Sequence, residues 1–126
     1  MKKLLILLFS ILISFNSYGK WVFYSESVKG NSFYFDSDSV KQHNGYVYFW
    51  YLKDYLKPDM DGDMSVKVYL QGDCDVNQYL YLTYIYYNEP MGNGNSTTLV
   101  GDTEWTYPPP DTIGASLLND ACAYVD

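Results

Sequence analysis

Few residues in this 126-residue chain carry side chains suited to catalysis. The single histidine, His43, directly precedes Asn44-Gly45, a dipeptide typical of tight hairpin turns. Nucleophilic catalysis needs a base that a third group holds in position, and a histidine in an exposed turn lacks that support. The sequence contains no Gly-x-Ser-x-Gly motif, and its carboxylates form no pair that facing strands would bring together. We therefore predict that the protein is not an enzyme.

An acidic loop carries a candidate set of metal ligands. Asp59, Asp61 and Asp63 stand at alternate positions, as at the start of a calcium-binding loop. An EF-hand loop would also need glycine where Met64 stands and glutamate where Leu70 stands. We therefore expect a solvated loop between two strands and predict neither a metal site nor a cofactor. A looser calcium site is the alternative.

The two cysteines, Cys74 and Cys122, are expected to form a disulfide bond. Their number is even, and the chain carries an export signal, so they should meet an oxidising compartment. Two cysteines with one distant histidine do not make a zinc site. In the chain-entropy model a bond that closes a loop of this length stabilises the fold by about 4 kcal/mol.

Residues 1–19 have the features of a secretory signal peptide. Two lysines precede a ten-residue apolar run at 4–13, and small residues occupy the positions before a cut at Lys20. The run is too short to span a bilayer, and no later segment is long and apolar enough to do so. No cysteine lies near the cut, so we expect no lipid anchor. The mature domain should comprise residues 20–126.

The charge balance excludes several classes of partner. The chain has no arginine, and six lysines against 15 acidic residues leave the mature domain nine negative charges. Such a surface repels nucleic-acid phosphates and anionic lipid headgroups. We therefore predict that the protein binds neither nucleic acid nor a membrane surface.

Alternating apolar residues and frequent turn signals predict a sequence of strands. The clearest strand is 64–71, where Met64, Val66, Val68 and Leu70 alternate with polar residues and Tyr69. The other expected strands cover 20–28, 33–35, 46–52, 77–88 and 96–100. Three prolines at 108–110 end sheet pairing, and helical spacing begins near Thr112. The predicted fold class is α+β, mainly β: a single antiparallel sheet of about five or six strands with one C-terminal helix tethered by the disulfide.

Two of these strands, 46–52 and 77–88, carry large aromatic groups on both faces. One helix can cover only one face of the sheet. Either the chain's own loops cover the second face, or a tyrosine-rich surface binds a protein partner or a second copy. Tyrosine suits such a surface because its ring is apolar while its hydroxyl stays hydrated. We predict that Tyr79, Tyr81 and Tyr87 share one strand face and form the binding face.

With these elements in order, the chain resembles the surface-adhesin protein E family of exported bacterial proteins. The resemblance covers nearly the whole mature domain. Its anchors are Trp21, Phe35-Asp36, Ser39-Val40, Val47-Tyr48-Phe49-Trp50, Asp54-Tyr55, Ser65-Val66-Lys67, Asp73-Cys74, Met91-Gly92, Gly94, Trp105, Pro110-Asp111-Thr112, Leu118 and Cys122. The resemblance implies an antiparallel sheet with a disulfide-tethered helix, adhesion to host extracellular proteins, and a homodimer.

The sequence thus supports two functional hypotheses. The first is an exported, non-catalytic, adhesin-like binding module that contacts host or envelope proteins. The second is a periplasmic structural or accessory protein, which the missing lipidation cysteine favours. The predicted location is accordingly the periplasm, the medium or the cell surface.

Overall fold

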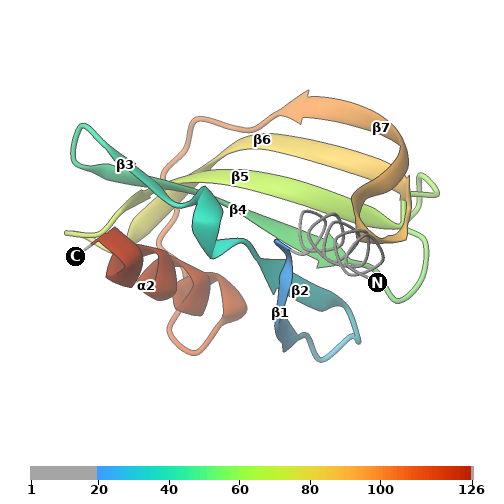
Figure 1. Cartoon of the computed structure of the whole chain (residues 1–126), viewed down its shortest axis with the longest axis horizontal. Coiled ribbons are helices and arrows are strands. Elements are labelled where there is room, and N and C mark those ends of the chain that lie inside the picture. Colours follow the sequence, from blue (N-terminus) through green and yellow to red (C-terminus); the bar gives the residue numbers. More distant parts are fainter. Residues whose placement is uncertain (1–19, 126) are drawn as a thin grey trace, which may run out of the picture.

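The computed structural model describes residues 20–125, which form one antiparallel sheet and one C-terminal α-helix (Figure 1). The predicted signal peptide, residues 1–19, lies outside the described residues, so its cleavage stays a prediction.

The sheet contains seven strands, six of them in one continuous hydrogen-bonded order. They are β1 (Val22–Glu26), β2 (Ser32–Phe35), β3 (Lys41–His43), β4 (Tyr46–Asp54), β5 (Ser65–Asp73), β6 (Gln78–Glu89) and β7 (Asn93–Val100). The order across the sheet is β1-β2-β4-β5-β6-β7, and β3 pairs with β4 off this path. Short 3₁₀ turns, Ser37–Ser39 (η1) and Pro90–Gly92 (η2), connect some of the strands. The predicted α+β fold is confirmed, with β3 as an additional short strand.

Alternation along the strands gives the sheet two chemically distinct faces. Phe49 of β4 pairs with Leu70 of β5, which pairs with Tyr81 of β6. These three side chains point to the side on which the helix α2 (Ile113–Val125) packs, which we call the helix face. Trp50 pairs with Tyr69 on the other side, which we call the opposite face.

The core lies between α2 and the helix face. It consists of aromatic and aliphatic side chains from four strands and the helix: Phe35, Val47, Phe49, Val66, Val68, Leu70, Tyr79, Leu117, Leu118 and Ala121. Gly72 of β5 allows the close approach of the helix. A Cβ atom at this position would lie 2.6 Å from Leu118 Cδ1 and 2.9 Å from Val47 Cγ1, which is closer than packed carbon atoms tolerate.

Helix α2 is capped at its start and tethered near its end. Thr112 Oγ1 accepts a hydrogen bond from the backbone N–H of Ala115 at 3.2 Å, as expected of an N-cap. Cys122 forms the predicted disulfide with Cys74, which directly follows β5, 48 positions earlier. Figure 1 shows α2 at the end of the sheet with the β3–β4 turn, while the β4–β5 loop projects from the other end.

Two side chains hold the turn between β6 and β7. Ser65 is fully buried; its hydroxyl donates to the Glu89 carbonyl at 2.7 Å and accepts from the Gly92 N–H at 2.9 Å. Asp54 accepts a hydrogen bond from the Met91 N–H at 2.8 Å. Met91 has a φ of 60°, which is unfavourable for a residue with a side chain, so these bonds keep the turn in place.

Candidate functional site

Four tyrosines of β6 form a continuous row on the helix face. The ring centroids of Tyr79 and Tyr81 are 5.3 Å apart, those of Tyr81 and Tyr84 are 5.6 Å apart, and those of Tyr84 and Tyr86 are 6.1 Å apart. The last two pairs are stacked, with interplanar angles of 22° and 23°. The row starts beneath α2 and continues along the sheet toward the β4–β5 loop. It therefore supplies a run of aromatic surface with a hydroxyl at each step.

A β-bulge makes one part of the predicted binding face wrong. Tyr81 and Thr83 pair with consecutive residues of β5, which leaves Leu82 as an extra residue in β6. The bulge shifts the alternation of side chains by one position. Tyr87 therefore points to the opposite face, and Tyr79, Tyr81 and Tyr87 do not share one face.

Tyr79 belongs to the core rather than to an exposed surface. Its side chain is 6% exposed and packs against Gly114 in the first turn of α2, where a Cβ atom would collide with its hydroxyl. The Tyr81 hydroxyl donates to the Tyr79 hydroxyl at 3.3 Å. A role in binding for Tyr81 or for Tyr87 stays a prediction.

Three tyrosine hydroxyls of the helix face, those of Tyr51, Tyr55 and Tyr84, are held in the neutral form. Burial, together with the nearby hydroxyls of Tyr81 and Tyr79, raises the pKa of Tyr51 well above its ordinary value. Burial is also the main cause that raises the pKa of Tyr55 and of Tyr84 to about 12. At neutral pH these groups are uncharged hydrogen-bond donors and acceptors. They can therefore bind a polar ligand but supply no base.

A pocket of about 210 Å³ opens where the first turn of α2 meets the sheet. Phe33, Tyr51 and Ile113 line it together with Lys53 of β4. The Lys53 ammonium lies 5.6 Å from the ring centroid of Phe33 and 5.5 Å from that of Tyr55. Burial and the charge of a second lysine lower the pKa of Lys53. This pocket could not be predicted from the sequence, because its lining comes from four strands, β2, β4, β5 and β6, and from α2.

The acidic loop lines a second pocket, of about 470 Å³, at the far end of the tyrosine row. One carboxylate oxygen from each of Asp59, Asp61 and Asp63 lies within 4.8 Å of the others. Tyr55 and Tyr86 form aromatic walls beside them, and β7 closes the remaining side. We call this the acidic–tyrosine pocket.

Local backbone bonds shape the acidic loop. The Asp59 carboxylate accepts hydrogen bonds from the N–H groups of Asp61 and Asp63, each at 2.9 Å. The Asp59 N–H donates to the Asp63 carbonyl at 2.9 Å, and Gly62 has a φ of 85°. Asp59 thus organises the loop, while the carboxylates of Asp61 and Asp63 make no side-chain hydrogen bond to the described residues.

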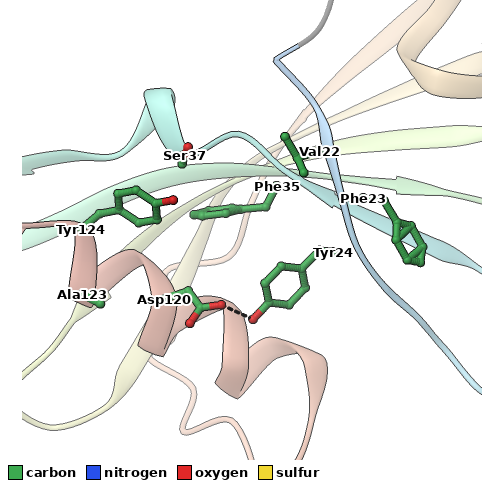
Figure 2. A pocket seen from close by; sticks show the side chains of 8 residues that line it. All are labelled: Val22, Phe23, Tyr24, Phe35, Ser37, Asp120, Ala123 and Tyr124. Atoms are coloured by element: carbon green, nitrogen blue, oxygen red, sulfur yellow. Dashed lines mark hydrogen bonds between the residues drawn. The ribbon is translucent and has the colours of Figure 1, made fainter.

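A third pocket, of about 370 Å³, lies between β1 and α2 (Figure 2). Val22 and Phe35 give it apolar walls, and Tyr124 of the helix closes one side. The Tyr24 hydroxyl donates to a carboxylate oxygen of Asp120 at 2.6 Å, which links the edge strand to the helix. Burial, followed by the contact with Asp120, raises the pKa of Tyr24.

The opposite face carries a second group of aromatic rings. Trp50 and Tyr69 are stacked with centroids 4.6 Å apart. Near the β3–β4 turn, Trp105 from the segment after β7 packs on Tyr46 at 5.6 Å. A loop of the chain therefore covers part of this face, in line with the first of the two alternatives drawn from the sequence.

The only histidine lies where the sequence predicted. His43 is exposed at the end of β3, and Asn44 and Gly45, with φ values of 52° and 84°, form the turn into β4. Its ring Nε2 lies 3.1 Å from the side-chain amide nitrogen of Asn44. Within residues 20–125, no carboxylate holds this ring in place as a triad would require.

The model of the surface-adhesin protein E family matches residues 21–123. The fold is similar to crystal form II of Haemophilus influenzae protein E, with a TM-score of 0.66, 20% identity, and coverage of 86% of this chain and 91% of that one. Protein E from non-typeable Haemophilus influenzae is similar as well, with a TM-score of 0.58, 21% identity, and coverage of 83% and 76%. The comparison with curated proteins gave no match.

The match extends over almost all of the mature domain and includes the sheet, the disulfide and the helix. None of the helices in residues 20–125 has the length and apolar character needed to span a membrane. The family is one of surface adhesins, which agrees with the predicted exported, adhesin-like protein. The chain belongs to the surface-adhesin protein E family.

Proposed function

We propose that this chain is an exported, non-catalytic binding module that holds a host or envelope protein against the helix face of its sheet. The observation that carries the proposal is the row of β6 tyrosines. It begins in the core at Tyr79 and continues beyond α2 through the half-buried Tyr84 to the half-buried Tyr86, which borders an open pocket. Tyrosine rings are common at protein interfaces, because they bury apolar area while their hydroxyls keep hydrogen bonds.

The geometry also favours recognition over reaction. The hydroxyls of Tyr51 and Tyr84 have raised pKa values and remain protonated at neutral pH, so they do not act as bases. The carboxylates of the acidic loop gather at one end of the tyrosine row, where they can orient a charged partner.

The first experiment is localisation in the organism that produces the protein. Protease shaving and antibody labelling of intact cells should detect the protein, and its intact mass should correspond to a start at Lys20. Detection only after the outer envelope is permeabilised would support the alternative, a periplasmic structural or accessory protein.

The second experiment measures binding of the exported protein to immobilised host extracellular proteins. Replacing Tyr86 with alanine should weaken binding without lowering the melting temperature by more than a few degrees, because Tyr86 is half-buried at the end of the row. Tyr48→Ala on the opposite face is the matched control. If both variants bind like the wild type, the helix face is not the binding surface.

A further inference from the structure

The acidic–tyrosine pocket combines two features that recognise organic cations. The flat rings of Tyr55 and Tyr86 form its walls, and the three carboxylates of the β4–β5 loop lie beside them within 4.8 Å of one another. Aromatic faces attract ammonium and guanidinium groups, and carboxylates accept their hydrogen bonds.

The loop concentrates negative charge at this point. Partial desolvation and the neighbouring carboxylates of Asp59 and Asp61 raise the pKa of Asp63, so the folded chain holds these groups together against their repulsion. A cation bound between Asp61 and Asp63 would relieve that repulsion. The chain as a whole is also acidic, with a formal net charge of −7, and this adds to the attraction of a cation.

The same fold already places lysines against tyrosine rings. The Lys53 ammonium lies 5.5 Å from the ring centroid of Tyr55, and the Lys67 ammonium lies 5.0 Å from that of Tyr87. These internal contacts have the geometry of cation–π interactions. A lysine or arginine from outside would find the same chemistry at Tyr86, together with free carboxylates.

We propose that the acidic–tyrosine pocket receives the side chain of a lysine or arginine from an exposed segment of a protein partner. The inference rests on the proposed binding function and names the partner chemistry of that site. Leu99, which is 51% exposed on β7 beside the pocket, contacts the aliphatic stem of the bound side chain. A metal ion fits less well, because Oδ1 of Asp59 already accepts hydrogen bonds from two backbone N–H groups, which leaves only the second oxygen of that carboxylate for an ion.

The test is an NMR titration of the isotope-labelled exported protein with an acetylated peptide of alternating lysine and serine. Saturable shifts should appear at the amides of Tyr55, Asp61, Asp63 and Tyr86, and a matched peptide of alternating glutamate and serine should cause none. The double variant Asp61→Asn/Asp63→Asn loses two exposed ion pairs with the lysines of the peptide. Its Kd for the lysine peptide should therefore rise about five- to tenfold.

A matched control separates local recognition from general charge. The double variant Asp38→Asn/Asp75→Asn removes the same two charges from exposed positions outside the pocket, so its Kd should stay close to that of the wild type. Equal weakening in both double variants would overturn the proposal, because it would show nonspecific attraction to an acidic surface.

Three further results would also overturn it. Calcium chloride could shift the same amides while the peptide causes no response, which would assign the loop to a metal ion. The amides could shift with protein concentration alone, which would assign the pocket to a second copy of the chain. Finally, Asp61→Asn/Asp63→Asn could retain full binding to a host protein; the proposed function would then stand, with a different contact site.

Discussion

The position of Tyr79 in the core leads to the sharpest prediction about stability. Replacing Tyr79 with alanine removes a ring that is 6% exposed and packed between Tyr81 and the first turn of α2. Truncating a buried aromatic side chain costs about 3–5 kcal/mol, which is a large share of the roughly 5–15 kcal/mol that stabilises a domain. Tyr87 makes a suitable comparison, because it lies on the same strand but on the opposite face.

Tyr87→Ala should cost much less. Its ring is half-buried and contacts the Lys67 ammonium at 5.0 Å, an interaction worth about 0.5–1 kcal/mol at an exposed site. Tyr79→Phe keeps the ring and removes only the hydroxyl that Tyr81 contacts at 3.3 Å, so it should cost about 0.5–1.5 kcal/mol. The expected order of destabilisation is Tyr79→Ala, then the two milder variants.

Urea unfolding followed by tryptophan fluorescence measures these differences, provided that the dependence of the free energy on urea concentration stays constant. If Tyr87→Ala lowered the free energy of unfolding as much as Tyr79→Ala, the assignment of the two tyrosines to different faces would be refuted. A Tyr79→Ala variant as stable as the wild type would refute its place in the core.

Three other predictions concern stability. Replacing Cys74 and Cys122 with serine should lower the free energy of unfolding by about 4 kcal/mol in urea, and an unchanged midpoint would contradict the tether. Ser65→Ala should cost about 1–3 kcal/mol and speed hydrogen exchange in the β6–β7 turn, whereas unchanged exchange would show that the hydroxyl does not hold the turn. The raised pKa values of Tyr55 and Tyr84 should give stability that is fully present below pH 10, the pKa of an unperturbed tyrosine, and is lost as the pH rises through about 12. Urea midpoints measured at increasing pH should therefore fall, and the fall should be smaller in the double variant Tyr55→Phe/Tyr84→Phe. If the midpoints of the wild type and of this variant fell equally with pH, the raised pKa values would be contradicted.

Much of the sheet is predictable from the sequence because the strands differ in pattern from the loops between them. The alternation of Val66, Val68 and Leu70 identifies β5, and the helical spacing after three prolines identifies α2. Strand β3 escaped prediction because Lys41–His43 is polar and exposed at every position, so no apolar alternation marks it.

The binding face was harder to predict, for a geometric reason. Strict alternation places Tyr87 with Tyr79, but the bulge at Leu82 reverses that assignment. The extra residue does leave a signal in the sequence. From Tyr79 to Tyr86 the tyrosines follow the spacing Tyr-x-Tyr-x-x-Tyr-x-Tyr, and all four can lie on one face only if the strand contains a bulge between Tyr81 and Tyr84.

The acidic–tyrosine pocket could not be predicted in the same way. Its lining comes from the β4–β5 loop, from β6 and from β7, and their meeting depends on the order of strands in the sheet. The sequence reveals the three aspartates but not the tyrosine walls beside them.

The most direct test of the central claim is site-specific photo-crosslinking of the exported protein in its native setting. A photo-reactive amino acid in place of Tyr86 should give adducts with a protein partner, and mass spectrometry should locate the crosslink in a peptide that contains lysine or arginine. The same amino acid in place of Tyr48, on the opposite face, should give none. Adducts from position 48 alone, or from neither position while the protein still binds its partner, would contradict a binding surface on the helix face.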